Sequence, residues 1–188
     1  MKLNKLIAIA TISLLSGGIS MAQKALNLEN IVAGNVIQTK GIGSMTWLKD
    51  GERYSRLENN KQTGGTDIVA YRAKDNSREV IIPSSLLTDK STGKPIPVRS
   101  ISWSADNEKV LIYNNTQRVW RYDTRGDYWV LNLKDGALRQ LGKGMPESSM
   151  MFAKFSPDGT RVAYVSNNNI YVEDIDLSLI HISEPTRH

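Results

Sequence analysis

The chain has 188 residues, with 24 Lys and Arg against 19 Asp and Glu, 40% hydrophobic residues and no cysteine. This is the composition of an ordinary globular protein, and it excludes a disulfide scaffold, a cysteine nucleophile and a disordered chain. Both histidines, His181 and His188, lie at the very end. The rest of the chain lacks the side chains on which most zinc sites and nucleophile–base pairs depend, so we expect no metal and no cofactor.

The formal net charge is +5, but the Lys and Arg residues are scattered and form no run of like charge. A surface for nucleic acid would need basic residues clustered on one face or along one element. We therefore expect no nucleic-acid partner.

Residues 1–22 have the three parts of a secretion signal. Lys2 and Lys5 give a positive start, residues 6–15 are mainly apolar, and small residues lead up to Ala22. The alternative is a buried or anchoring helix, but the apolar run is short and two glycines follow it. We expect cleavage after Ala22 and a bacterial protein that is secreted or periplasmic, with no membrane attachment once the signal is removed.

Residues 23–36 form a leading segment with one expected helix, from Leu28 to Gly34. Asn27 can cap the first turn of this helix and Gly34 can end its last turn. Helical periodicity is nearly absent from the rest of the chain. We treat residues 23–36 as a linker.

Residues 177–188 are similar to the in-frame translation of an adapter used in sequencing libraries. A genuine tail of this sequence is the alternative. We interpret the segment as an artefact, exclude it from the fold, and expect the natural protein to continue differently after Asp176.

A short pattern recurs roughly every fifty residues in the central part of the chain, which is a spacing found in propeller blades. Trp47, Trp103 and Phe155 are each followed three positions later by an Asp and then by Gly or Asn. Asp-Gly and Asp-Asn favour turns because these residues tolerate positive φ and the Asp side chain can accept hydrogen bonds from nearby amides. Each copy therefore predicts a turn that leads into a strand.

Short β-rich runs follow each turn. In the second unit they are separated by a polar break at 114–116 and by a turn at Gly126-Asp127, and in the third unit by an Asn turn at 167–169. The predicted strands are residues 52–57, 67–72, 78–82, 109–113, 118–122, 128–133, 137–141, 161–165 and 170–172.

Four antiparallel strands per unit of about fifty residues are typical of a β-propeller. We therefore predict an all-β fold in which residues 37–176 form a partial β-propeller of about two and a half four-stranded blades. An all-β sandwich with recurring hairpins is the alternative. Blades bury their faces only against their neighbours, so such a partial array should be marginally stable on its own.

A more specific pattern surrounds the second unit. Trp120-Arg121 occurs within a long second strand, Tyr128 follows, and a Ser-Pro-Asp-Gly turn begins at Ser156. Residues 26–31 look like a short helix ahead of the first blade. Together these features resemble the amino-terminal propeller of the dipeptidyl peptidase IV family, over roughly residues 26–174.

This resemblance implies a secreted serine exopeptidase, with an eight-bladed propeller followed by an α/β-hydrolase domain. Its substrates would be peptides with Pro, or less readily Ala, at the second position, from which it removes dipeptides. Whether its subunits pair as a homodimer stays open. The alternatives are a periplasmic scaffold propeller without enzymatic activity, and a prolyl tripeptidyl or acylaminoacyl peptidase relative.

The resemblance also implies one substrate-binding residue, Arg121, whose counterpart in the family hydrogen-bonds a substrate carbonyl. A guanidinium is permanently charged and offers several donors in a fixed fork, which suits this task. The alternative is a surface arginine paired with Asp123 or Asp127. The sequence contains neither the family's adjacent Glu pair nor a Gly-x-Ser-x-Gly elbow, so we expect no catalytic residue in this chain and no activity from it alone.

Overall fold

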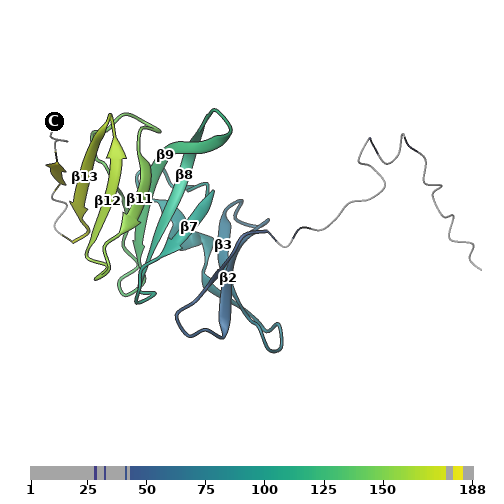
Figure 1. Ribbon diagram of the computed structural model, residues 1–188. Helices are drawn as coiled ribbons and strands as arrows, with labels where there is room; N and C mark the ends of the chain where they lie inside the picture. The colour runs from purple at the N-terminus through teal and green to yellow at the C-terminus, as the bar shows by residue number, and fades with distance from the viewer. Residues whose placement is uncertain (1–27, 29–31, 33–40, 42, 177–179, 184–188) are drawn as a thin grey trace, which may run out of the picture. The chain divides into compact units, whose positions relative to one another are not determined.

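In a computed structural model, the described residues are 28, 32, 41, 43–176 and 180–183 (Figure 1). The chain divides into two units, Met1–Gly41 and Ile42–His188, and the fold described here is that of the second. The predicted signal peptide lies outside the described residues. So does most of the leading segment, of which Leu28 and Val32 are described, both exposed and in helical conformation.

The first sheet is an antiparallel meander in which consecutive strands are neighbours. Its second, third and fourth strands lie where the β-rich runs predicted them, and the first was not predicted. The strands are β1 (Met45–Trp47), β2 (Arg53–Asn59), β3 (Thr66–Arg72) and β4 (Arg78–Ile82). A short 3-10 helix, η1 (Ser84–Leu87), and a small ribbon of β5 (Thr88–Asp89) and β6 (Lys94–Pro95) lead on to the second sheet.

The second sheet has the same topology but a longer central pair of strands. It consists of β7 (Ser100–Trp103), β8 (Lys109–Val119), β9 (Tyr122–Asn132) and β10 (Leu138–Gln140). Because β8 and β9 extend well beyond β7 and β10, their hairpin projects from one end of the sheet (Figure 1).

Two predictions about the second sheet are wrong. The polar break at 114–116 is a bulge inside β8, where Asn115 adopts a φ of 43° and the register with β9 shifts. The predicted turn at Gly126-Asp127 lies within β9. A Cβ at Gly126 would lie 2.4 Å from the Tyr113 ring, so this glycine permits a close approach of two strands. Asn115 and Gly126 are residue types that favour turns, but here they lie inside β8 and β9 and do not end these strands.

The third sheet contains β11 (Met151–Phe155), β12 (Arg161–Ser166), β13 (Asn169–Asp174) and β14 (Ile180–Ser183). The sequence predicted half a blade here. The fourth strand comes from the segment attributed to an adapter, and it pairs with β13 from Ile170↔Ser183 to Glu173↔Ile180. Strand pairing uses backbone groups, so a short β-branched run can occupy a free sheet edge whatever its origin.

The recurring Asp turns join the first and second strands of each sheet, as predicted. Gly51, Asn107 and Gly159 have φ values of 68°, 60° and 67°. Hydrogen bonds from the Ser104 hydroxyl and the Glu108 amide lower the pKa of Asp106 to about 2. The corresponding bonds from Ser156 and Thr160 lower the pKa of Asp158 to about 2.

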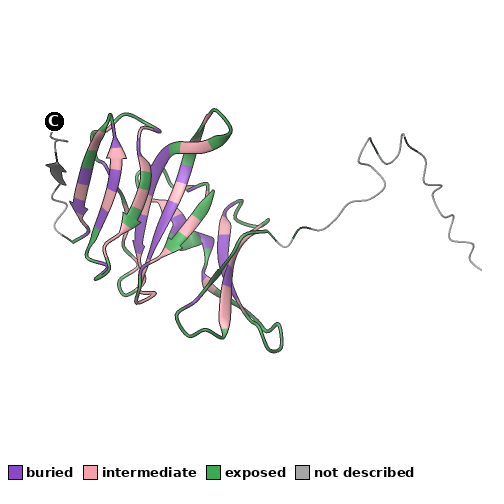
Figure 2. Ribbon diagram, viewed as in Figure 1, coloured by how far each residue is buried: buried purple, intermediate pink, exposed green. Residues whose placement is uncertain are grey.

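The second sheet is buried on both faces, because adjacent residues of β8 point into different apolar clusters (Figure 2). The cluster with the first sheet contains Ile68, Ile82, Leu87, Val110, Ile112 and Leu131. The cluster with the third sheet contains Leu111, Tyr128, Val130, Leu141, Met150, Val162, Tyr164, Tyr171 and Ile175. Three meanders that pack in chain order, and do not mix their strands, confirm the partial propeller.

The repeated aromatic residues contribute to these contacts where a preceding sheet exists. The Trp103 indole donates a 2.9 Å hydrogen bond to the Ser55 hydroxyl of β2, and Phe155 packs against the cluster shared with the second sheet. Trp47 is 56% exposed and makes an edge contact with Tyr54. Among the described residues, no helix is long and apolar enough to cross a membrane.

Candidate functional site

The predicted site residue Arg121 lies at the tip of the β8–β9 hairpin. Val119 pairs with Tyr122, so Trp120 and Arg121 are the two central residues of the turn. The prediction that they lie inside a strand is therefore wrong. Trp120 has a φ of 63° and is 94% exposed. A bulky side chain in this backbone region is strained and is not stabilised here by packing.

The guanidinium of Arg121 has neither of the partners that the surface interpretation required. Asp123 pairs with Arg99, at 3.1 Å between Nη2 and Oδ2. Asp127 accepts hydrogen bonds from the Asn115 side-chain amide at 2.7 Å and from the Ser148 backbone amide at 2.8 Å. Within the described part of the chain, the exposed Arg121 side chain is left with its donors unused.

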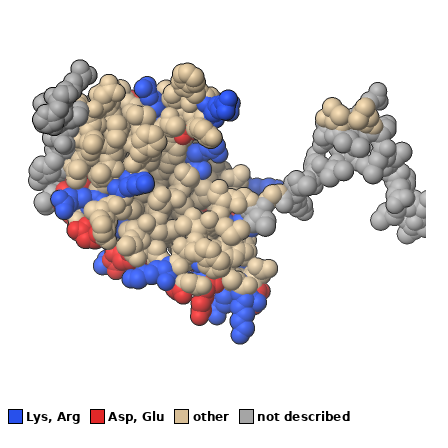
Figure 3. All heavy atoms as spheres, viewed as in Figure 1, with Lys and Arg blue, Asp and Glu red and all other residues tan. Residues whose placement is uncertain are grey.

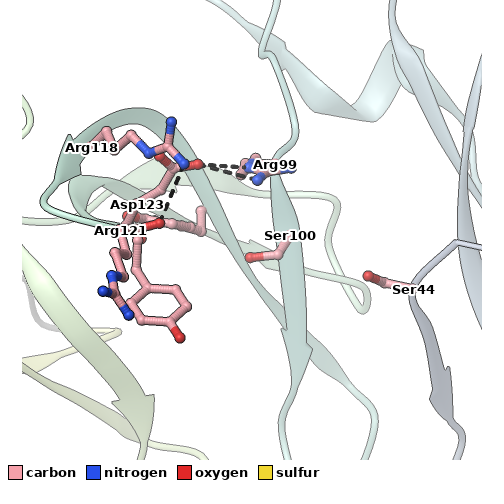
Figure 4. Close-up of a pocket in the computed structure, with 8 residues that line it drawn as sticks. Ser44, Arg99, Ser100, Arg118, Arg121 and Asp123 are labelled. Carbon is pink, nitrogen blue, oxygen red and sulfur yellow. Dashed lines mark hydrogen bonds and ion pairs between the residues drawn. The ribbon is translucent and has the colours of Figure 1, made fainter. Parts of the chain in front are cut away.

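Arg121 lines a shallow pocket of about 630 Å³ (Figure 4). The pocket lies between the hairpin and the starts of the first strands of the first two sheets, where Ser44 precedes β1 and Ser100 begins β7. The lining residues are Ser44, Arg99, Ser100, Tyr113, Arg118, Arg121, Tyr122 and Asp123. Three arginines against one carboxylate make the lining positive, and Figure 3 shows Lys and Arg side chains gathered at this end of the second sheet. Such a surface favours ligands rich in hydrogen-bond acceptors.

The hairpin is fixed at its base by contacts that the sequence did not predict. The Tyr113 hydroxyl lies 3.0 Å from the Asp123 carbonyl and 2.9 Å from the Arg125 carbonyl. Burial, with smaller contributions from Tyr128 and Asp123, raises the pKa of Tyr113 to about 12, so the hydroxyl remains a donor near neutral pH. Arg99 and Asp123 are 24 positions apart, and no motif in the sequence links them.

The aromatic residues of this region divide into two groups. Tyr128 stacks on Tyr113 with ring centroids 4.8 Å apart, which confirms cross-strand packing for this residue. Trp120 and Tyr122 are 94% and 74% exposed, so packing does not account for them. Exposed aromatic rings beside Arg121 add apolar contact area to the edge of the pocket.

The β8–β9 hairpin and the third sheet lie within the part of the chain that matches a protein-family model. Residues 104–184 match the family model of the dipeptidyl peptidase IV (DPP IV) N-terminal region. The chain is thus similar to the dipeptidyl peptidase IV family over fewer than half of its residues. The curated relatives that it matches are named dipeptidyl aminopeptidases.

Two of these relatives are fungal. The chain is 25% identical over 169 residues to the probable dipeptidyl-aminopeptidase B of Aspergillus terreus, covering 85% of this chain and 18% of the relative. It is 28% identical over 153 residues to the dipeptidyl aminopeptidase B of Saccharomyces cerevisiae, covering 76% of this chain and 17% of the relative. The chain thus spans less than a fifth of the length of either relative.

The fold is similar to that of a solved structure, Porphyromonas gingivalis dipeptidyl peptidase 4. The TM-score is 0.68 at 20% sequence identity, covering 87% of this chain and 22% of that one. This likeness supports the propeller architecture of the dipeptidyl peptidase IV N-terminal region.

Proposed function

We propose that this chain is the N-terminal part of a secreted serine dipeptidyl peptidase that removes X-Pro and X-Ala dipeptides from peptide N-termini. Its sheets would be the first blades of the propeller through which substrates reach the active site. The match to the N-terminal region of the dipeptidyl peptidase IV family and the names of the relatives support this proposal. The signal-like residues 1–22 support export.

One observation carries the role of this chain in that function: the β8–β9 hairpin presents the unpaired guanidinium of Arg121 beside an open pocket. A peptide backbone offers carbonyl oxygens at fixed spacing, and a planar guanidinium can hold one of them without a change in its own protonation. Arg121 would therefore orient the substrate. The acyl transfer would take place in the hydrolase domain that the family resemblance implies.

The test uses the full-length enzyme and a glycyl-prolyl chromogenic substrate. We expect Arg121→Ala to lower kcat/KM by at least about tenfold, which corresponds to roughly 1.4 kcal/mol of lost transition-state binding. Arg121→Lys should recover part of this loss, because an ammonium keeps the charge but lacks the planar fork. The exported enzyme should begin at Gln23, which N-terminal sequencing of the same preparation checks.

Arg125→Ala is the matched control, because Arg125 is an exposed arginine of the same hairpin that does not line the pocket. Its kcat/KM should stay within about twofold of the wild-type value. Unchanged kinetics for Arg121→Ala would show that Arg121 is a surface arginine that does not bind the substrate. Absence of any dipeptide release by the full-length protein would favour the scaffold alternative.

A further inference from the structure

The end of the β8–β9 hairpin has few backbone contacts that could fix its direction. The register between the two strands shifts twice, between Asn114 and Gln117 and between Gln117 and Arg118. Each shift interrupts the ladder of backbone hydrogen bonds. Trp120 at the tip is 94% exposed, so packing does not hold the tip either. The backbone pairs that remain are Gln117↔Arg125, Arg118↔Asp123 and Val119↔Tyr122, and Gly126 bridges to Met150 at the base. Side-chain contacts can therefore add to the orientation of the tip.

We propose that the ion pair between Arg99 and Asp123, supported by the Tyr113 hydroxyl, positions Arg121 for substrate binding. This inference rests on the proposed function of Arg121. Arg99 and Asp123 are positioning residues: they act on the substrate through the hairpin.

Arg99 approaches the hairpin from the segment just before β7. Its Nε and Nη2 lie 3.3 Å and 3.1 Å from Oδ2 of Asp123. Its backbone amide donates a 2.9 Å hydrogen bond to the Tyr113 carbonyl, so the base of the Arg99 side chain is itself fixed to β8. Asp123 lies two positions after Arg121, and a bond to its carboxylate restrains the turn that carries Arg121.

Tyr113 provides a second anchor on the same stretch of β9. Its hydroxyl is within hydrogen-bonding distance of the carbonyls of Asp123 and Arg125, and its ring stacks on Tyr128. The side chain of Asp123 is thus held by Arg99 and its backbone by Tyr113. In Figure 4 the Arg121 side chain extends away from the Arg99–Asp123 pair, which leaves its guanidinium available.

The expected signature of a positioning pair is a larger effect on activity than on stability. The Arg99 and Asp123 side chains are 64% and 29% exposed, and exposed ion pairs contribute little to folding. A displacement of about 1 Å at a substrate-orienting group, by contrast, can change the rate by as much as ~100-fold. Loss of the pair should therefore appear first in the kinetics.

The experiment measures kcat and KM of the full-length enzyme for the glycyl-prolyl substrate in Arg99→Ala and Asp123→Ala. Each should lower kcat/KM by about three- to tenfold with little change in the thermal midpoint. The matched control is Arg78→Ala, which breaks another surface ion pair, with Glu58, whose side chain is also 29% exposed. The control should stay within about twofold of wild type.

A double-mutant cycle separates positioning from general damage. If Arg99 acts through Arg121, then Arg99→Ala added to Arg121→Ala should cause no further loss. The double reversal Arg99→Asp with Asp123→Arg should restore part of the activity lost in either single reversal. The double reversal still tests the ion pair if a single variant folds poorly, because the reversed pair keeps one positive and one negative side chain.

Three outcomes overturn the proposal. The first is a loss for Arg99→Ala but none for Asp123→Ala, which would mean that Arg99 binds substrate itself. The second is wild-type kinetics for both variants. The third is an equal further loss in the Arg121→Ala background, which would indicate a purely structural role. A null effect of Arg121→Ala refutes the role of Arg121 in substrate binding and the positioning proposal with it. A loss for Arg121→Ala beside wild-type kinetics for both pair variants refutes the positioning proposal alone.

Discussion

Two hairpins of this molecule occupy the same place in successive sheets but have different tips. The β12–β13 hairpin turns at Asn167 and Asn168, with φ values of 49° and 65°. The β8–β9 hairpin turns at Trp120 and Arg121, and of these two only Trp120 has a positive φ. Asn is common at such positions because it tolerates the left-handed region, whereas Trp is not.

The two turns differ in whether their residues suit the backbone conformation that they adopt. The Asn turn has the residues that its own geometry favours, so this turn is locally consistent. The β8–β9 tip breaks this rule and keeps an exposed Trp beside the exposed Arg121. Strain and exposure at a turn beside a pocket are expected of a functional site. Phe152 of β11, with a φ of 58° and 62% exposed, is a second bulky residue in this backbone region, but it does not line the pocket.

The largest effect is expected at the base of the irregular hairpin. Gly126→Ala would place a Cβ 2.4 Å from the Tyr113 ring and 2.6 Å from the Asn114 carbonyl oxygen. We expect a loss of about 2–3 kcal/mol in stability, because neither neighbour can move without disturbing the sheet. Thermal unfolding measures the loss. Gly41→Ala, where the new Cβ meets no atom within 4 Å, is the control and should be nearly neutral.

A smaller change in stability, of opposite sign, is expected for substitutions at the tips of the β8–β9 and β12–β13 hairpins. Trp120→Gly should stabilise the protein by roughly 1 kcal/mol, because glycine adopts positive φ without steric cost and Trp120 loses no packing. Asn168→Gly should change stability by only a few tenths of a kcal/mol, because Asn already tolerates its φ. Equal thermal shifts in both variants would show that the Trp120 turn is not strained.

The smallest effect concerns the Asp turns at the opposite end of the sheets. The pKa of Asp158 is lowered from 3.8 to about 2, so its contribution is complete above pH 4 and is lost as the pH falls toward 2. Asp158→Asn keeps an acceptor oxygen but does not titrate. Its stability should therefore fall less between pH 4 and 2 than that of the wild type, as followed by thermal unfolding. Parallel pH curves would contradict the assignment.

The regular parts of the fold could be predicted from the sequence because their signals are local. The Asp turns and the Asn turn at 167–168 are encoded by the residues that form them. The site could be predicted only in part. The resemblance singled out Arg121, but the contacts beside it join Arg99, before β7, to Asp123 of β9 and Tyr113 of β8. Such contacts leave no periodic pattern in the sequence.

The errors had a related cause. Asn115 and Gly126 have the chemistry of turn residues, and in this chain they serve a bulge and a close strand approach. Sequence alone does not distinguish these uses, because both require the same backbone freedom.

The order in which the sheets pack has a consequence for synthesis. Each sheet is complete within one continuous stretch of chain and then packs against the sheet before it. The sheets can therefore fold one after another while the chain is synthesised, and each folded sheet offers an apolar face on which the next sheet packs. Only the leading face, with Trp47, Tyr54 and Tyr71, has no earlier layer to meet among the described residues. During synthesis, that face exposes aromatic rings, which chaperones can cover.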